Sequence, residues 1–365
     1  MSARDWIAYT CRYYAGDYKC DYRAGGCRVE ERYVGSLAGC VWKADANVSA
    51  VWTTLITNTA YLTGLLTLDY SLKKHGSKYP LIALYTDTFP EKGHKALDER
   101  GIPKQHVKYL LPKIQKDFTN DPRFYDCWSK LTPFSLEEYD RVVQLDSDML
   151  VLKNMDELME LELDAPSTGG KGDRVFAASH ACVCNPLKKP HYPKDWYVPL
   201  LSRFMRHVTN LNSRISENCA FTSQHSDPAA AQHTGAPSTA GLRMPNGGLQ
   251  VVNPSLATYN LILVQLSNET SMSYDFADQS LLGDLFNGRW VTLPYTYNAL
   301  KTLRSKGVHD AIWRDEEVKN VHYILSPKPW DEEAGKCSQE IHEWWWTVNN
   351  ERREAEKSKG IDDGF

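Results

Sequence analysis

The stretch from residue 142 to residue 152 constrains the fold most, because it places two carboxylates between two apolar runs. Val142 to Leu145 is rich in β-branched residues and predicts a strand that is buried on both faces. Asp146 and Asp148 follow directly, and Met149 to Leu152 then resumes an apolar strand. Because side chains alternate along an extended chain, both carboxylates point to the same side.

Paired carboxylates at the end of a buried strand indicate a site for a hard divalent cation. Mg²⁺ and Mn²⁺ prefer oxygen ligands, and they usually keep coordination positions free for substrate phosphates. A bound ion would also offset the cost of holding unpaired charge between two buried runs. An ordinary polar turn is the alternative, and the Asp-x-Asp spacing alone does not decide between the two.

Composition sets limits on the class of protein. The 365 residues are 42% hydrophobic, which is enough for a large core, and the net charge of −4 indicates no nucleic-acid surface. The sequence has no apolar run of the length that a membrane helix needs, and no secretory signal is visible at its start. We therefore expect a cytoplasmic protein with no membrane span and no nucleic-acid partner.

The nine cysteines are an odd number and are spread widely along the chain. Four of them fall within the first forty residues at spacings that match no zinc pattern: Cys11, Cys20, Cys27 and Cys40. A reducing compartment with free thiols is the resulting expectation.

Strand-like and helix-like runs alternate through the first half of the chain. Strands are expected at 51–57, 81–85, 107–111 and 142–145, and helices at 60–75, 91–100 and 127–139. This alternation predicts an α/β fold, with a mostly parallel sheet covered by helices on both faces. In such sheets ligands bind beyond the carboxyl ends of the strands, where Asp146 lies.

The chain divides into three parts on sequence pattern. Residues 1–47 have no clear period and are expected to form an irregular N-terminal extension, while 48–336 form the main domain and 337–365 a helical tail. The main domain carries a loosely patterned insertion at about 165–243. Within it, Gln224 to Gly241 is small and polar, which predicts a mobile loop; a functional lid is the alternative.

Residue types that bind zinc occur together in this insertion. They are His180, Cys182, Cys184 and His191. Their spacing is unlike that of known zinc sites, so no zinc site is predicted here.

Two later segments bring further candidate site residues. Gly247 and Gly248 lie in a turn before an apolar strand, where the absence of a side chain lets backbone approach a ligand closely. Asp275 and Asp278 lie three residues apart at the start of a helical run and therefore share one face. N-terminal capping is the alternative role for Asp278.

Motifs in the same order resemble glycosyltransferase family 8, which includes glycogenin and the plant galactinol synthases. The resemblance covers most of residues 51–331 apart from the insertion. It rests on Thr54 to Tyr61, Trp128-Ser129-Lys130-Leu131, Leu145-Asp146-Ser147-Asp148, Asn246-Gly247-Gly248, Asp275 to Gln279 and His322 to Trp330. Leu325 stands where the family usually has glycine.

The resemblance implies a GT-A type, Rossmann-like fold and a UDP-sugar donor bound with Mn²⁺ (or Mg²⁺). It implies His322 as the third metal ligand beside Asp146 and Asp148, and a catalytic role at the sugar for Asp275 or Asp278, with Lys130 adding positive charge. The donor-binding residues that it implies are Leu55, Thr57, Tyr61, Lys130, Ser147, Asn246, Gly247, Gly248, Gln279 and Lys328.

The expected function is metal-dependent, retaining transfer of a hexose from UDP-glucose or UDP-galactose to a small hydroxyl acceptor, as in galactinol synthases. No tyrosine lies between Asn298 and Ile312, the segment that carries the acceptor tyrosine in glycogenin. Tyr295 and Tyr297 lie before it and are expected to pack against the sheet. A glycogenin-like self-glucosylating protein and a catalytically decayed sugar-nucleotide-binding protein are the alternatives, and a homodimer is left open.

A nucleotidyltransferase would also combine an α/β fold with paired carboxylates. Its glycine-rich, basic loop after the first strand is missing, because Thr57 to Gly64 contains one glycine and no lysine or arginine. This reading is therefore the less favoured one.

Overall fold

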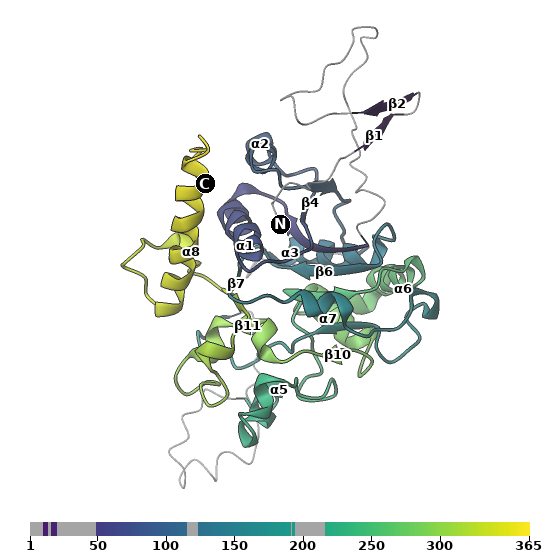
Figure 1. The fold of residues 1–365 in the computed structure, drawn as a ribbon. Coiled ribbons are helices and arrows are strands. Elements are labelled where there is room, and N and C mark those ends of the chain that lie inside the picture. The colour runs from purple at the N-terminus through teal and green to yellow at the C-terminus, as the bar shows by residue number, and fades with distance from the viewer. Residues whose placement is uncertain (1–9, 14–15, 20–48, 115–122, 191, 194–215) are drawn as a thin grey trace.

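The computed structural model describes residues 10–13, 16–19, 49–114, 123–190, 192–193 and 216–365. Its centre is a seven-stranded sheet in the order β10-β8-β9-β6-β3-β4-β5 (Figure 1). The strands are β3 (Ala50–Ile56), β4 (Leu81–Tyr85), β5 (Lys104–His106), β6 (Arg141–Leu145), β8 (Phe176–Ala178), β9 (Leu249–Val252) and β10 (Val291–Thr292).

This sheet is mostly parallel, as expected from the alternating pattern. The strands β5, β4, β3 and β6 run parallel to one another, and β10 runs parallel to β8. Only β9 reverses direction, and it pairs antiparallel with β6 and with β8. Its pairing of Leu145 with Leu249 sets the Gly247–Gly248 turn directly against the carboxyl end of β6.

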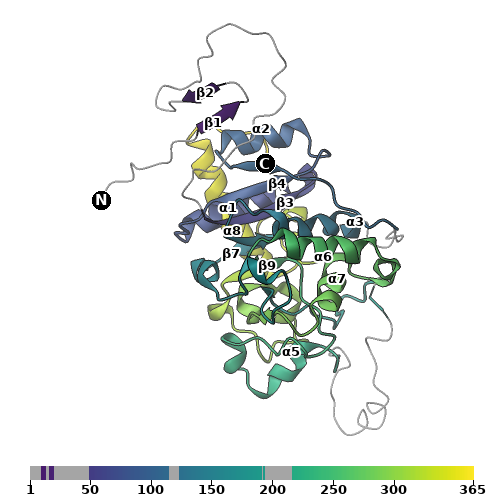
Figure 2. The ribbon, with the colours of Figure 1, turned by 90° about the vertical axis from the view of Figure 1, so that its right-hand side faces the viewer.

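Helices cover both faces of the sheet, which confirms the predicted α/β class (Figures 1 and 2). The helices are α1 (Leu62–Lys74), α2 (Glu91–Glu99), α3 (Arg123–Cys127), α5 (Ala220–Ser223), α6 (Leu256–Ser267), α7 (Ala277–Leu285) and α8 (Glu340–Lys357). Val142 packs with Ile262 of α6 and Leu281 of α7, whereas its neighbour Val143 packs with Leu68 of α1. Alternate residues of one strand therefore serve opposite faces, as the pleat requires.

A second, three-stranded sheet brings the end of the chain to the centre. It has the order β11-β12-β7, formed by β7 (Met149–Val151), β11 (Ala299–Leu300) and β12 (Asn320–His322). The antiparallel register of β12 and β7 pairs His322 with Met149. This pairing sets His322 beside the residue that follows Asp148.

Two sequence expectations are wrong at the level of single elements. The strand expected at 107–111 is displaced to β5, Lys104–His106. The helix expected at 127–139 is instead the short α3 followed by a 3₁₀ helix at Trp128–Ser135, which contains Pro133. A proline removes one backbone donor, and the tighter helix accommodates it better than a continuous α-helix does.

The expected mobile loop at Gln224 to Gly241 is also contradicted, because this segment packs on the main domain. Gln232 is 8% exposed; its amide donates to the carbonyl of Ile312 at 2.7 Å and accepts from the Tyr295 hydroxyl at 2.7 Å. Earlier in the insertion, β8 joins the central sheet. The segment was misread because its contacts are hydrogen bonds and small side chains, which leave no apolar pattern in the sequence.

Regular structure is found near both ends of the chain. The predicted helical tail contains α8, which packs beside α1, and Trp345 is fully buried against Trp330 at a ring separation of 5.5 Å. Arg100 pairs with Asp363 at 2.8 Å, so ionic contacts also attach the last residues. In the N-terminal extension, Thr10–Tyr13 and Gly16–Lys19 form a short hairpin, β1 and β2; the rest of that extension lies outside the described residues. Among the described residues, no helix has the length and apolar character of a membrane span.

Candidate active site

Three predicted metal ligands meet at the carboxyl end of β6. Asp146 follows β6 and its backbone N–H donates to the Gly248 carbonyl at 2.8 Å, while Asp148 precedes β7. The Nε2 atom of His322 lies 3.5 Å from Asp146 Oδ2 and 3.3 Å from Asp148 Oδ1. One ligand atom from each residue lies within 4.8 Å of the others, so one ion could contact all three.

A hydrogen-bond chain fixes the orientation of His322. Asn298 donates its amide to Asn246 Oδ1 at 2.9 Å, which leaves its own oxygen to accept from His322 Nδ1 at 2.8 Å. With the proton assigned to Nδ1, the lone pair of Nε2 faces the two carboxylates, which is the arrangement a metal ligand needs. Gly248 is required next to this ring, because a Cβ there would lie 2.3 Å from His322 Cε1.

These residues fit a divalent ion of the Mn²⁺ or Mg²⁺ class by their chemistry. Two carboxylates and one imidazole supply hard oxygen donors and one nitrogen, leaving positions for the oxygens of a substrate. Asp148 and His322 are 6% and 3% exposed. The carboxylate of Asp148 is therefore shielded from water and needs a positively charged partner.

Two lysines, the buried Lys328 and the partly buried Lys130, supply positive charge around the same carboxylates. Lys130 Nζ lies 2.7 Å from Asp146 Oδ2, and Lys328 forms an ion pair with Asp148. Burial would lower the pKa of Lys130, but the charge of Asp146 outweighs it and holds that pKa well above the usual value. Burial would likewise raise the pKa of Asp148, but the charge of Lys328 outweighs it and holds that pKa well below the usual value. The site therefore keeps its charges at neutral pH.

A pocket opens beside this cluster and includes most of the residues predicted to bind a donor. The predicted site residues that line it are Leu55, Thr57, Tyr61, Lys130, Asp146, Ser147, Asp148, Asn246, Gly248, Asp278, Gln279 and His322. Gly247 and Lys328 are not among its lining residues, although both contact residues that are. Gly247 donates its N–H to Gln279 Oε1 at 2.9 Å.

The structure separates the two candidate carboxylates at the sugar. Asp275 is exposed and is not among the residues that line the pocket, whereas Asp278 is 2% exposed and lines it. A Cβ on Gly247 would lie 2.0 Å from Asp278 Oδ2, so glycine is needed for this approach. That oxygen has no hydrogen-bond partner among the described residues, while backbone N–H groups at the start of α7 bond to the same carboxylate. Capping is therefore only part of the role of Asp278.

The surroundings of Asp278 raise the pKa of its carboxyl group toward neutral pH. Its pKa is raised to about 7, first because burial disfavours the ionised form; Lys130 lowers the pKa and Asp146 raises it. A buried carboxyl group that titrates near neutral pH beside a pocket is characteristic of functional sites.

Leu325, which stands where the family usually has glycine, has a backbone conformation that glycine adopts readily. Its φ angle is +62°, in the left-handed region that non-glycine residues rarely adopt, and its side chain lines the pocket at 6% exposure. Leucine at this position therefore places an apolar side chain on the pocket wall at a strained backbone position.

Several pocket residues were not predicted from the sequence. Asp126 accepts from Thr57 Oγ1 at 3.0 Å and from the Tyr109 hydroxyl at 2.5 Å, and Asn298 orients His322 as described above. Further lining residues are Ile56, Asn58, Cys127, Ala181, Cys182, Tyr192, Met244, Phe276, Leu300 and Ile324. Ile56, Asn58, Phe276 and Ile324 lie inside motifs already quoted from the sequence, and Asp126 lies just before the Trp128–Leu131 motif.

Comparison with known proteins gives a consistent result over most of the chain. The model of Glycosyl transferase family 8 matches residues 53–334. The chain is 25% identical to galactinol synthase 4 of Arabidopsis thaliana over 84% of this chain and 83% of that protein. It is 26% identical to galactinol synthase 1 of Ajuga reptans over 82% of this chain and 80% of that protein.

A solved structure of similar fold supports the architecture. The bifunctional glycosyltransferase WbbM aligns with a TM-score of 0.52 at 14% identity; the alignment covers 84% of this chain and 50% of the WbbM chain. The predicted GT-A type of fold is confirmed by this likeness together with the mostly parallel sheet. With the family model matching through the Asp146–Asp148 motif and on past Lys328, this chain belongs to glycosyl transferase family 8 and is a glycosyltransferase.

Proposed function

We propose that this enzyme transfers a hexose from a UDP-sugar to a small hydroxyl acceptor, with a divalent metal ion and with retention of anomeric configuration. One observation carries the proposal: the Asp146, Asp148 and His322 cluster and two lysines that pair with its carboxylates lie together at one side of a pocket. This arrangement suits a ligand with a diphosphate group.

Asp146, Asp148 and His322 would hold the ion, which would neutralise charge that develops on the diphosphate as the sugar leaves. Lys130 and Lys328 now lie on the two carboxylates. With a cation held by these carboxylates, Lys130 and Lys328 would add positive charge beside the phosphate oxygens of the donor. Mn²⁺ and Mg²⁺ both fit this role.

Asp278 is the residue that we assign to the sugar end of the donor. Its Oδ2 atom lies close to the Gly247 backbone at the pocket wall. Among the described residues, this atom has no hydrogen-bond partner. In the ionised form it would stabilise the positive charge of an oxocarbenium-like transition state. Asp275 is not assigned a role at the sugar, because its side chain is exposed.

The similarity to galactinol synthases favours a polyol such as myo-inositol as the acceptor. Release of UDP would be measured with UDP-glucose and UDP-galactose, each with and without Mn²⁺ and with and without myo-inositol. We expect Mn²⁺-dependent release from one donor that increases when the polyol is present. Binding of UDP without any turnover would instead favour the decayed sugar-nucleotide-binding protein.

Self-glucosylation is the second candidate function. Tyr295 is one of two candidate acceptor residues. It is fully buried; its hydroxyl donates to Gln232 and accepts from the backbone N–H of Arg314 at 2.8 Å. Tyr297 donates its hydroxyl to Glu157 at 2.7 Å. Both contacts speak against an acceptor role, although Tyr61 and Tyr192 line the pocket.

Intact-mass spectrometry after incubation with donor and Mn²⁺ separates the two candidates. An unchanged chain mass together with formation of a sugar–polyol product supports the proposal. A ladder of added hexoses on the chain would assign the enzyme to the self-glucosylating type.

A further inference from the structure

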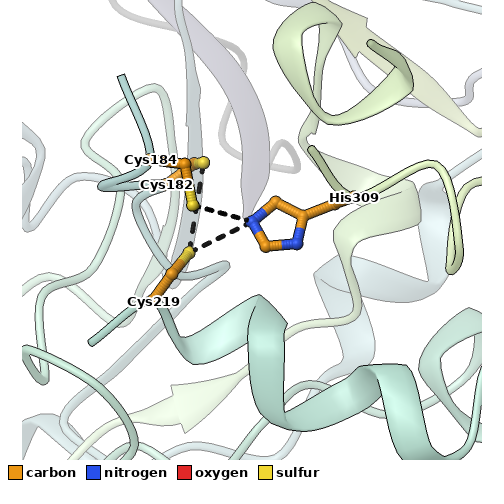
Figure 3. Close-up of side chains that lie close together, drawn as sticks. All are labelled: Cys182, Cys184, Cys219 and His309. Carbon is orange, nitrogen blue, oxygen red and sulfur yellow. Dashed lines mark hydrogen bonds between the residues drawn. The ribbon is translucent and has the colours of Figure 1, made fainter. Parts of the chain in front are cut away.

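A second cluster of metal-binding residue types adjoins the pocket, because one of its members, Cys182, also lines the pocket. Figure 3 shows the side chains of this cluster. It consists of Cys182 and Cys184, which follow β8, Cys219 at the N-cap of α5, and His309. All four side chains are buried. We refer to these four residues as the Cys₃His cluster.

The distances in the Cys₃His cluster are those of a tetrahedral site. His309 Nε2 lies 3.2 Å from Cys184 Sγ and 3.3 Å from Cys219 Sγ, and the sulfurs of Cys219 and Cys182 are 4.0 Å apart. Zinc bonds are about 2.3 Å long to sulfur and about 2.0 Å long to nitrogen. In a tetrahedral site, two sulfur ligands are therefore about 3.8 Å apart, and a sulfur and a nitrogen ligand are about 3.5 Å apart. All four ligand atoms lie within 4.8 Å of one another, so one ion could contact all four.

The surrounding residues orient the ligands as metal sites require. His309 Nδ1 lies 2.9 Å from His225 Nε2. With a proton between these two nitrogens, Nε2 of His309 directs a lone pair toward the three sulfurs and can bind a metal ion. The backbone N–H of Ser216 donates to Cys184 Sγ at 3.3 Å, which would stabilise a thiolate. Neither contact is needed for three cysteines that merely fill space in a core.

We propose that Cys182, Cys184, Cys219 and His309 bind one structural Zn²⁺ ion, at a site separate from the catalytic metal. Each of the three thiols loses its proton to solvent when it coordinates, while His309 binds as neutral imidazole. Four protein ligands fill the coordination shell and leave no position for a substrate, which is the mark of a structural zinc site.

The ion would connect three segments that lie far apart in the sequence. Cys219 and His309 are separated by 90 residues, and Cys219 and Cys182 by 37 residues. Because Ala181 and Cys182 also line the active-site pocket, zinc would fix one pocket wall to α5 and to the loop that contains His309. None of these four residues belongs to the cluster of Asp146, Asp148 and His322, so zinc binding here does not depend on the identity of the substrate.

A disulfide is the competing use of these cysteines. The Cys182 and Cys219 sulfurs are 4.0 Å apart, far beyond the length of about 2.05 Å for a sulfur–sulfur bond. Each of the three cysteines in the cluster is a free thiol in the structure.

The first test is the zinc content of the purified full-length chain after dialysis against metal-free buffer, measured by plasma mass spectrometry. Wild type should retain about one zinc ion more per chain than Cys219→Ser or His309→Ala, because each variant removes one ligand. The test rests on the difference in zinc content between wild type and each variant. Other cysteines of the chain can also hold zinc, but they would contribute equally to both. Cys337→Ser, a half-exposed cysteine outside the cluster, is the matched control and should keep the wild-type content.

Asp148→Asn is a second control, because it changes only the catalytic cluster and should also keep the ion. Wild-type zinc content in Cys219→Ser would overturn the proposal, as would the absence of zinc from wild type purified without chelator.

Since loss of a buried ligand can prevent folding, a second measurement uses the wild-type chain expressed in medium that contains Co²⁺ in place of Zn²⁺. A tetrahedral site with three thiolates should give strong visible d–d bands and a near-ultraviolet thiolate-to-cobalt charge-transfer band. Bound Co²⁺ without the tetrahedral d–d bands and the thiolate charge-transfer band, or a disulfide between cluster cysteines in non-reducing peptide maps, would contradict the proposal.

Discussion

The two buried clusters of this enzyme use histidine in the same way but differ in every other ligand. His322 and His309 each have Nδ1 bonded to a neighbouring side chain, Asn298 or His225, so that Nε2 faces the remaining ligands. Around His322 the ligands are two carboxylates at an open pocket, whereas around His309 they are three thiols enclosed by protein. Hard oxygen ligands with open positions suit catalysis on phosphates, and a closed set of sulfur ligands suits stabilisation.

The largest expected effect is at the open site, on activity. Asp148→Asn should reduce Mn²⁺-dependent donor turnover by about 10³-fold or more, because one charged ligand of the ion is lost. Steady-state UDP release at saturating donor measures this. The variant should also unfold at a lower temperature, because it leaves the buried ammonium of Lys328 without its carboxylate partner, so turnover is compared on samples that circular dichroism shows to be folded at the assay temperature. Full turnover in Asp148→Asn would remove the metal assignment for this cluster.

The closed site should show the reverse pattern, with stability lost before chemistry. Cys219→Ser should lower the free energy of unfolding by several kcal/mol and the melting temperature by on the order of 10 °C, because the bound ion contributes to folding. Differential scanning calorimetry of wild type, Cys219→Ser and Cys337→Ser makes the comparison. An unchanged melting temperature in Cys219→Ser, with Cys337→Ser also unchanged, would mean that the cluster holds no stabilising ion.

A smaller effect concerns the pH dependence of stability at the open site. The pKa of Asp278 is about 7 in the folded chain and near 3.8 when unfolded, so the folded state binds the extra proton between these values. Stability from this group is therefore complete below about pH 4 and falls as the pH rises toward 7, by on the order of a few kcal/mol.

Urea unfolding at several pH values without added Mn²⁺, compared between wild type and Asp278→Asn, isolates this contribution. The wild type should lose stability relative to the variant between pH 4 and pH 7. Asp275→Asn is the matched control, because that side chain is exposed. A parallel pH profile for wild type and Asp278→Asn would show that the carboxyl group is ionised throughout.

The smallest expected effect tests the backbone of the pocket wall. Leu325→Gly and Leu325→Ala both remove the buried side chain, but only alanine keeps a Cβ at a φ angle of +62°. Leu325→Gly should therefore be the more stable of the two by about 1 kcal/mol, measured by urea unfolding at one pH. Equal stabilities would show that the turn relaxes to an unstrained conformation in the variants.

Local patterns predicted much of the catalytic half of the molecule. The apolar run of β6 and the alternation that follows it were enough to place Asp146 and Asp148 on one side of a strand. Comparable periodicity gave α1 and β4, because each buries one continuous surface. The reversal of β9 was not visible in the sequence, since strand direction depends on the path of the chain and not on residue pattern.

Long-range contacts decided what local patterns missed. Gln232 belongs to a segment without apolar period, and it is held by hydrogen bonds to residues more than sixty positions away. The choice between Asp275 and Asp278 likewise needed the Gly247 turn, which lies in a different part of the sequence.

The sequence by itself determined the class of fold, the Asp146–Asp148 pair and the family resemblance, because each depends on residues that are close together in the chain. The expectation of no zinc site rested on the spacing of His180, Cys182, Cys184 and His191. In the folded chain His180 instead bonds to the carbonyl of Ala236 at 3.1 Å, and His191 lies outside the described residues.

Only the tertiary structure brought Cys219 and His309 to Cys182 and Cys184. Zinc coordination needs four donor atoms within a few ångströms, and it places no limit on the length of chain between them. A site assembled from three distant segments therefore leaves no spacing signature. It becomes visible when β8, α5 and the His309 loop are packed together.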